Sequence, residues 1–154
     1  MEFDSKKFLK EKFTDRTGSV SVPDMVAWFS GKGKPAFTVR GLTGKEVGIA
    51  RVAAARNKSV EGILKMLKDA KVSEQVDALK SVFDMDLSGA TEETAIRIEY
   101  FKIGCVEPKG SMDLAVKVCT NFPIEFDLIV TEISKLTGMG RQPGKPKKSG
   151  KKVT

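Results

Sequence analysis

Histidine is absent from this chain of 154 residues, and its absence excludes several kinds of functional site. A protein without imidazole has no Ser-His-Asp or Cys-His catalytic group, no histidine-bound metal and no histidine pH switch. Cysteine is scarce as well. Cys105 and Cys119 are too far apart for a CxxC motif, so we expect reduced thiols in a cytoplasmic protein.

Long apolar runs are also missing. No run approaches the roughly 18 residues that a membrane-spanning helix needs, so no membrane contact is expected. The charged start, MEFDSKKFLKEKF, lacks the apolar segment of a signal peptide. With 40% apolar residues, the chain can nevertheless bury a hydrophobic core, and its length fits a single domain.

The positive charge is concentrated in two stretches. The net charge is +7, and residues 31–59 and 138–154 each carry +6, so the remainder of the chain is acidic. The second stretch, GMGRQPGKPKKSGKKVT, has no acidic residue and no apolar periodicity. We therefore expect a folded domain of residues 1–137 followed by a flexible basic tail, residues 138–154.

Local patterns predict mostly helices. Residues 19–40 are rich in β-branched and aromatic side chains around the turn GKGKP, which predicts short strands. Elsewhere apolar residues recur at helical spacing, and Thr43 with Glu46 matches a capping box. The expected helices span about 43–56, 59–70, 72–83, 91–103, 111–119 and 124–136, with a loop at 104–110, and residues 4–14 are a weaker candidate for a short helix. The predicted fold is mainly α: five or six short helices packed as a bundle, with a small N-terminal β element and a disordered basic C-terminal tail.

The sequence contains no recognisable catalytic group. Asp84, Asp86, Ser88 and Gly89 match the first ligand positions of an EF-hand loop, but Ala95 stands where the bidentate glutamate belongs. The other acidic pairs fall in predicted turns and helix caps, where carboxylates are solvated. We therefore expect no catalytic residue, no cofactor and no metal, and a binding protein rather than an enzyme.

Residues 46–65 allow a second interpretation, a DNA-binding helix-turn-helix. Ala50, Ala54, Val60 and Ile63 fall at the positions that pack the two helices of that motif, and the surrounding basic stretch would contact phosphates. The second helix, however, has no Arg, Asn or Gln to read base edges. Nucleic acid is therefore not the favoured partner.

Three stretches of the chain together resemble a known family. PAFTVRGLTGKE at 35–46 leads into an alanine-rich helix, and IGCVEP occupies 103–108. NFP at 121–123 is followed by a helix, by LTGMG at 136–140 and by the basic tail. In order and spacing these stretches resemble the tail assembly chaperones of long-tailed bacteriophages, over about residues 35–150.

The resemblance implies a non-enzymatic protein of the host bacterial cytoplasm that binds the tape measure protein and helps to recruit tail tube subunits. It also implies a longer fusion product, made by a −1 ribosomal frameshift near the end of the gene. Slippery sites often encode Gly-Lys, and Gly144-Lys145 and Gly150-Lys151 lie in the tail. Many copies are needed to cover a long partner, so the role is compatible with self-association.

A protein that holds an amphipathic helix needs apolar side chains at helical spacing on its surface. The stripe Phe126, Ile129 and Ile133 of the last predicted helix is the first candidate contact face, and Trp28 with Phe29 is the second. The alternative for the stripe is that it belongs to the core, and the alternative for the aromatic pair is core or interface packing.

Overall fold

The computed structural model describes residues 1–69 and 91–144, and over residues 58–69 the backbone only. The predictions for 70–90, including the helix at 72–83 and the acidic turn at Asp84–Gly89, lie outside the described residues, as does the tail segment 145–154. The helices are α1 (Ser5–Lys10), the 3-10 helix η1 (Pro23–Trp28), α2 (Gly44–Asp69), α4 (Glu92–Gly104), α5 (Met112–Asn121) and α6 (Pro123–Gly138). The strands are β1 (Phe13–Thr14), β2 (Thr17–Ser21), β3 (Ala36–Arg40), β4 (Cys105–Glu107) and β5 (Gln142–Pro143).

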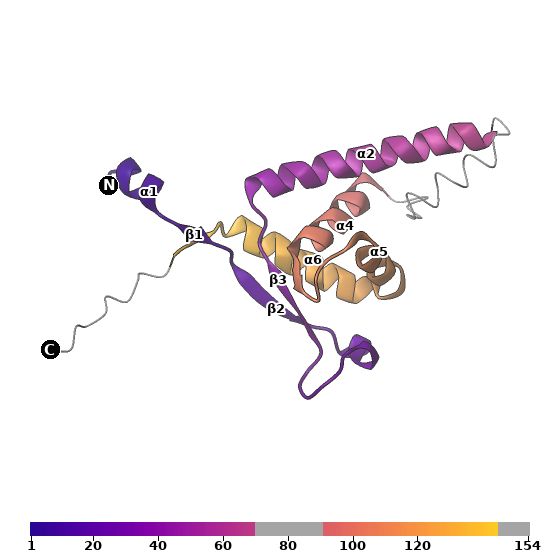
Figure 1. Ribbon diagram of the computed structural model, residues 1–154, viewed down its shortest axis with the longest axis horizontal. Helices are drawn as coiled ribbons and strands as arrows, with labels where there is room; N and C mark the ends of the chain where they lie inside the picture. Colours follow the sequence, from indigo (N-terminus) through magenta and orange to yellow (C-terminus); the bar gives the residue numbers. More distant parts are fainter. Residues whose placement is uncertain (70–90, 145–154) are drawn as a thin grey trace.

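An antiparallel sheet with the strand order β2-β3-β4 lies against the helices (Figure 1). β2 and β3 pair from Thr17 opposite Arg40 to Ser21 opposite Ala36, which confirms the strands predicted around the glycine-rich turn. Because side chains alternate along a strand, Phe37 and Val39 are buried on one face. α6 contacts this part of the sheet.

β4 was not predicted, because its three residues lie in the segment expected to be a loop. It pairs with β3 through Val39 opposite Cys105 and Thr38 opposite Glu107, with a shift of register between the two pairs. The expectation of a helical bundle with a small N-terminal β element is therefore confirmed only in part. The fold is a mixed α/β arrangement in which the sheet shares one core with α4, α5 and α6.

Aromatic rings connect the sheet to the helices in this core. The ring centroid of Phe37 in β3 lies 6.0 Å from that of Phe101 in α4. Phe101 stacks on Phe126 of α6, with 5.6 Å between the centroids. The three side chains are at most 4% exposed. α4 also contacts α2, α5 and α6, so it is the central helix of the domain.

Three predicted helix starts are confirmed by their hydrogen bonds. The hydroxyls of Thr91 and Ser111 each accept from the backbone N–H three residues later. At the start of α2, the N–H of Glu46 donates to the Thr43 hydroxyl at 3.2 Å, and the N–H of Thr43 donates to the Glu46 carboxylate at 2.9 Å. This reciprocal pair is the predicted capping box.

α2 is one continuous helix of 26 residues, where the sequence predicted two helices with a new start at Ser59 (Figure 1). The predicted break is wrong because no proline interrupts the segment, and serine and asparagine cost little inside a helix flanked by strong helix formers. A helix-turn-helix needs a turn that sets its second helix at an angle to the first. Residues 46–65 therefore lack the geometry of the alternative interpretation.

The folded part of the chain reaches beyond the predicted boundary at residue 137. β5 pairs with β1, placing Pro143 opposite Phe13. Arg141 forms an ion pair with Asp15 at 2.8 Å, and Arg16 donates to the carbonyl of Gly140 at 2.9 Å. Residues 139–144 are thereby bound to the N-terminal segment, next to α1, which projects from the body and buries no residue (Figure 1).

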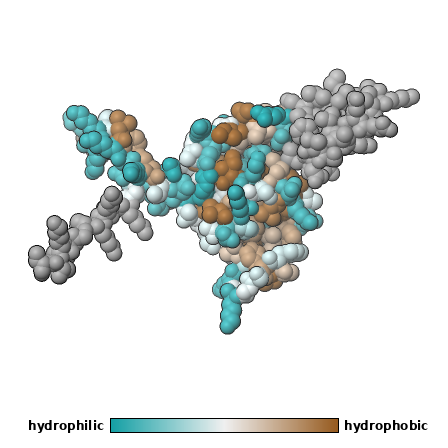
Figure 2. Space-filling model, viewed as in Figure 1, coloured by the Kyte–Doolittle hydropathy of each residue, from teal (hydrophilic) through white to brown (hydrophobic). Residues whose placement is uncertain are grey.

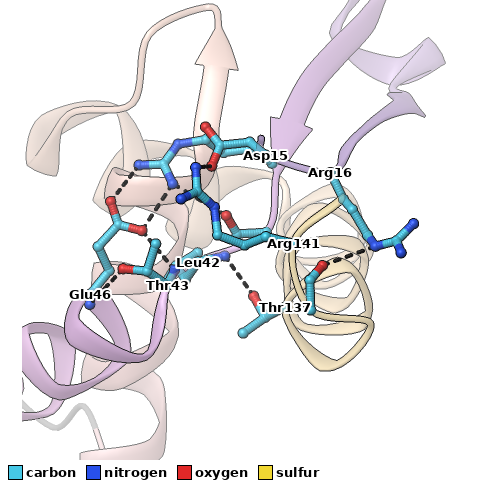
Figure 3. A network of polar contacts seen from close by, with 10 residues as sticks. Asp15, Arg16, Leu42, Thr43, Glu46, Thr137 and Arg141 are labelled. Carbon is cyan, nitrogen blue, oxygen red and sulfur yellow. Dashed lines mark hydrogen bonds and ion pairs between the residues drawn. The ribbon is translucent and has the colours of Figure 1, made fainter. Parts of the chain in front are cut away.

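A polar network joins the start of α2 to the end of β3 (Figure 3). The Arg40 guanidinium donates to both carboxylate oxygens of Glu46, at 2.7 and 2.9 Å. This hydrogen bonding outweighs burial and, with the bond from the Thr43 N–H, lowers the pKa of Glu46 from 4.5 to about 2. The same pairing with Glu46 raises the pKa of Arg40.

We expect Glu46→Gln to lower the free energy of unfolding by about 1–2 kcal/mol at pH 7, because it removes a bidentate charged pair and keeps an acceptor for the cap. Because the pKa of Glu46 is lower in the folded than in the unfolded protein, its ionised carboxylate stabilises the fold fully above the unfolded pKa of 4.5. This contribution is lost as the pH falls toward 2. Urea denaturation between pH 7 and pH 2 should therefore show the two proteins converging in acid. Glu132→Gln, which removes only a contact of 4.0 Å to the exposed Lys135 side chain, is the control, with an expected change within about 0.5 kcal/mol.

Candidate partner-binding site

The structure places the first predicted contact face inside the protein. Phe126 is 4% exposed, and Ile129 and Ile133 are fully buried against the sheet and α4. The stripe has the helical spacing expected of a contact face, but α6 directs it into the core because that side of the helix covers the sheet. The prediction that these residues form a partner-binding surface is therefore wrong. They belong to the core, which was the alternative for this stripe.

The second predicted pair is divided between the surface and the core. Trp28, at the end of η1, is 69% exposed and meets Phe122 edge-on, with 5.3 Å between the ring centroids. Phe29 is half-buried and packs toward Phe37 at 6.1 Å. Only Trp28 thus remains available to a partner, and its role in binding stays a prediction.

A third apolar surface, which the sequence analysis did not single out, lies on α2. Ile49 and Val52 are 50% and 62% exposed, whereas Val47 of the same helix packs against the core. The small residues Ala50 and Ala54 are buried, on the face directed at α4. α2 therefore packs Val47 and these two alanines inward and leaves the apolar side chains of Ile49 and Val52 exposed to solvent on its other side.

A shallow, open hollow of about 480 Å³ lies along the exposed side of α2. The lining residues that the structure describes share one side of the helix and are Lys45, Gly48, Ile49, Val52, Ala53 and Arg56. We call this surface the α2 groove. Figure 2 shows hydrophobic side chains exposed among hydrophilic ones over this part of the molecule. The spacing of Lys45, Ile49, Val52 and Arg56 is four, three and four residues, which is the seam of a helix-to-helix contact.

Cations stand at both ends of the α2 groove. Lys45 and Arg56 are exposed, and neither forms an ion pair with a residue that the structure describes. Over 44–57, the part of α2 whose side chains are described, the one carboxylate is that of Glu46, which Arg40 already binds. The groove is therefore apolar in the middle and positive at its two ends.

The cysteines offer little chemistry. Both are free thiols, and burial raises the pKa of Cys105 to about 12 and also raises that of Cys119. A thiol with such a pKa is protonated at neutral pH and is a poor nucleophile. Across 1–69 and 91–144, no group of three His, Cys, Asp or Glu side chains is placed to hold a metal ion.

The three stretches that carry the family resemblance come together in the fold. β3 belongs to the first and β4 to the second, and the two strands pair at Val39 and Cys105. The loop after β3 packs against the end of α6, where the N–H of Leu42 donates to the Thr137 hydroxyl at 2.8 Å (Figure 3). These residues therefore build one structural junction rather than an open surface.

In the described part of the chain, no helix combines the length and the hydropathy that crossing a membrane requires. Comparisons of this chain with models of protein families, with curated proteins and with solved structures found no match.

Proposed function

We propose that this protein is a non-enzymatic tail assembly chaperone of a long-tailed bacteriophage. It acts in the host bacterial cytoplasm, where it binds the tape measure protein, keeps it soluble and helps to recruit the tail tube protein. The proposal includes a longer product made by a frameshift within the codons of the basic tail.

The observation that carries the proposal is the α2 groove. A chaperone of a long helical protein needs an exposed apolar seam on which an amphipathic helix can lie, and Ile49 and Val52 supply one at helical spacing. The convergence of the three family-like stretches on one junction adds support, because they act as a single structural unit.

Co-expression with the tape measure protein of the same genome tests the proposal. We expect the tape measure protein to be insoluble alone and soluble with this chain, and the two to co-purify in a fixed ratio of several copies to one. Removal of residues 145–154 should leave the complex intact, because the apolar seam lies on the folded domain. A tape measure protein that stays insoluble, or a complex that depends wholly on the basic tail, would contradict the proposal.

A further inference from the structure

The three-stranded sheet has an unpaired edge along β2, the outer strand in the order β2-β3-β4 (Figure 1). Just outside the strand, the carbonyl of Arg16 and the N–H of Val22 bond to residues that flank β3, at 2.9 and 3.0 Å. Pairing alternates along antiparallel strands, so the N–H and C=O groups of the odd-numbered residues between them point away from β3. No hydrogen bond from a described residue reaches those backbone groups. The residues concerned, all with exposed side chains, are Thr17, Ser19 and Ser21.

This edge lacks the usual protection against a further strand. Exposed edge strands are commonly protected by a lysine, a proline or a β-bulge. The strand β2 has the sequence TGSVS, and it pairs with β3 over all five residues without a shift of register. Its backbone is therefore regular, uncharged and suited to accept another extended strand.

The segment 70–90 of the same chain is poorly suited to that role. Its apolar residues recur at helical spacing, which favours a helix over an extended strand. A helix bonds its own backbone groups and has none to add to the edge of a sheet. The residues with that spacing are Val72, Val76, Leu79 and Phe83.

The tail segment 145–154 is poorly suited as well. β5 runs antiparallel to β1, and the N–H of Gly144 donates to the carbonyl of Lys12 at 2.6 Å. The chain is thus directed past β1 toward α1 where the tail begins, whereas β2 starts at the other end of β1. The tail also contains Pro146 and five lysines, which disfavour strand pairing.

A second copy of β2 fits the edge in one antiparallel register. A twofold axis through the middle of the strand places Ser19 opposite Ser19 of the other copy, and Thr17 opposite Ser21. Each of these pairs then exchanges two backbone hydrogen bonds. The facing side chains are small hydroxyls, which can bond across the two strands without bringing like charges together.

Charges at the ends of this register are complementary. Arg16 of one copy faces Val22 of the other, and Asp24 follows two residues later at the start of η1. The carboxylate of Asp24 is exposed and forms no ion pair with a described residue. Because of the twofold axis, a cation and a carboxylate meet at both ends of the shared edge.

Helix α6 adds apolar surface beside the same edge. A Cβ on Gly18 would lie 3.0 Å from Oε1 of Glu132, so this side of α6 stands over β2. Leu128, one turn before Glu132, is 49% exposed. Since α6 contacts both β2 and β3, the two α6 helices of a pair would lie about 10 Å apart, a distance at which helices pack.

We propose that β2 pairs with β2 of a second copy, antiparallel and centred on Ser19, so that two sheets join into one sheet of a twofold dimer. The backbone groups of Thr17, Ser19 and Ser21 supply the hydrogen bonds, and α6 supplies the apolar contact. This inference goes beyond the proposed function and does not depend on it.

Single cysteines at the edge test the register in the full chain. Ser19→Cys should give a disulfide-linked dimer under mild oxidation, because the two Cα atoms at position 19 would be about 5.5 Å apart, within the range that a disulfide spans. Ser21→Cys should not cross-link with itself, but it should cross-link with Thr17→Cys when the two proteins are mixed. The wild type, with its own two thiols, is the control on a non-reducing gel.

A charge exchange at position 19 tests the pairing without a covalent link. Ser19→Lys and Ser19→Glu should each weaken the dimer at least about tenfold, because like charges then face each other across the axis. An equimolar mixture should restore dimers, because lysine then faces glutamate. Analytical ultracentrifugation over a range of concentrations measures association, and circular dichroism verifies that both variants are folded. The control is Val106→Lys and Val106→Glu, at a half-exposed position on β4, the opposite edge strand.

Four results would overturn the proposal. The wild type stays monomeric up to its solubility limit, or Ser21→Cys cross-links with itself as readily as Ser19→Cys does. The mixture of lysine and glutamate variants fails to restore dimers, or the Val106 variants lose the dimer as well. Deletion of 145–154 provides one more measurement: the dimer should persist, and a dimer that forms only after deletion would show that the tail covers the edge.

Discussion

Phe126→Ala is expected to lower the free energy of unfolding by about 3–5 kcal/mol, a large part of the roughly 5–15 kcal/mol typical of a domain. The Phe126 ring is 4% exposed and stacks on Phe101 at 5.6 Å, so its removal opens a cavity between α6 and α4. Chemical denaturation followed by circular dichroism measures the loss.

Leu128→Ala on the same helix is the matched control. Leu128 is 49% exposed, so its truncation should change stability by about 1 kcal/mol or less. If Phe126→Ala proved no more destabilising than Leu128→Ala, the buried position of the stripe would be wrong. The stripe would then again be a candidate surface for a partner.

Gly41→Ala is expected to destabilise the protein by about 3 kcal/mol, the upper part of the usual range for overpacking. A Cβ at Gly41 would lie 2.8 Å from the carbonyl carbon of Leu136 and 2.9 Å from the backbone nitrogen of Thr137. These are backbone atoms of α6, which cannot move aside as a flexible side chain can. The loop after β3 would have to shift away from α6 and lose the hydrogen bond between Leu42 and Thr137.

Gly48→Ala is the control, and it should change the stability of the protein in the opposite direction. No atom lies within 4 Å of a Cβ at Gly48, and the residue is exposed inside α2. Alanine there should raise the free energy of unfolding by about 0.5–1 kcal/mol, because it restricts the unfolded chain and favours the helix. Thermal melting of both variants measures the two changes in stability. A Gly41→Ala protein as stable as Gly48→Ala would show that the backbone of α6 does not lie close to Gly41.

Much of the local structure could be predicted from the residues themselves. The cap pairs at Thr43, Thr91 and Ser111 are determined by side chains within three positions, so the helix starts followed from the sequence. The alternation of β-branched residues with a glycine-rich turn likewise identified β2 and β3. Such signals are short in range and do not depend on the rest of the fold.

The rest could not be predicted, because it depends on contacts between distant parts of the chain. β4 is three residues long and becomes a strand only because β3 lies beside it. Ser59 resembled a helix cap, but a cap signal competes with the helix formers on both sides, and α2 continues through it. The predicted contact face on α6 was wrong for a related reason. Helical spacing shows that apolar side chains share one side of a helix, but it does not show whether another part of the fold covers that side.

The sequence by itself determined the absence of imidazole chemistry, the uneven distribution of positive charge and the places where most helices begin. Only the tertiary structure decided which apolar stripe faces outward. Phe126 and Ile133 on α6 are buried because that helix covers the sheet, whereas Ile49 and Val52 on α2 are exposed because the small alanines on the opposite face pack inward. Both helices carry apolar side chains at helical spacing, and burial depends on neighbours that a one-dimensional pattern does not contain.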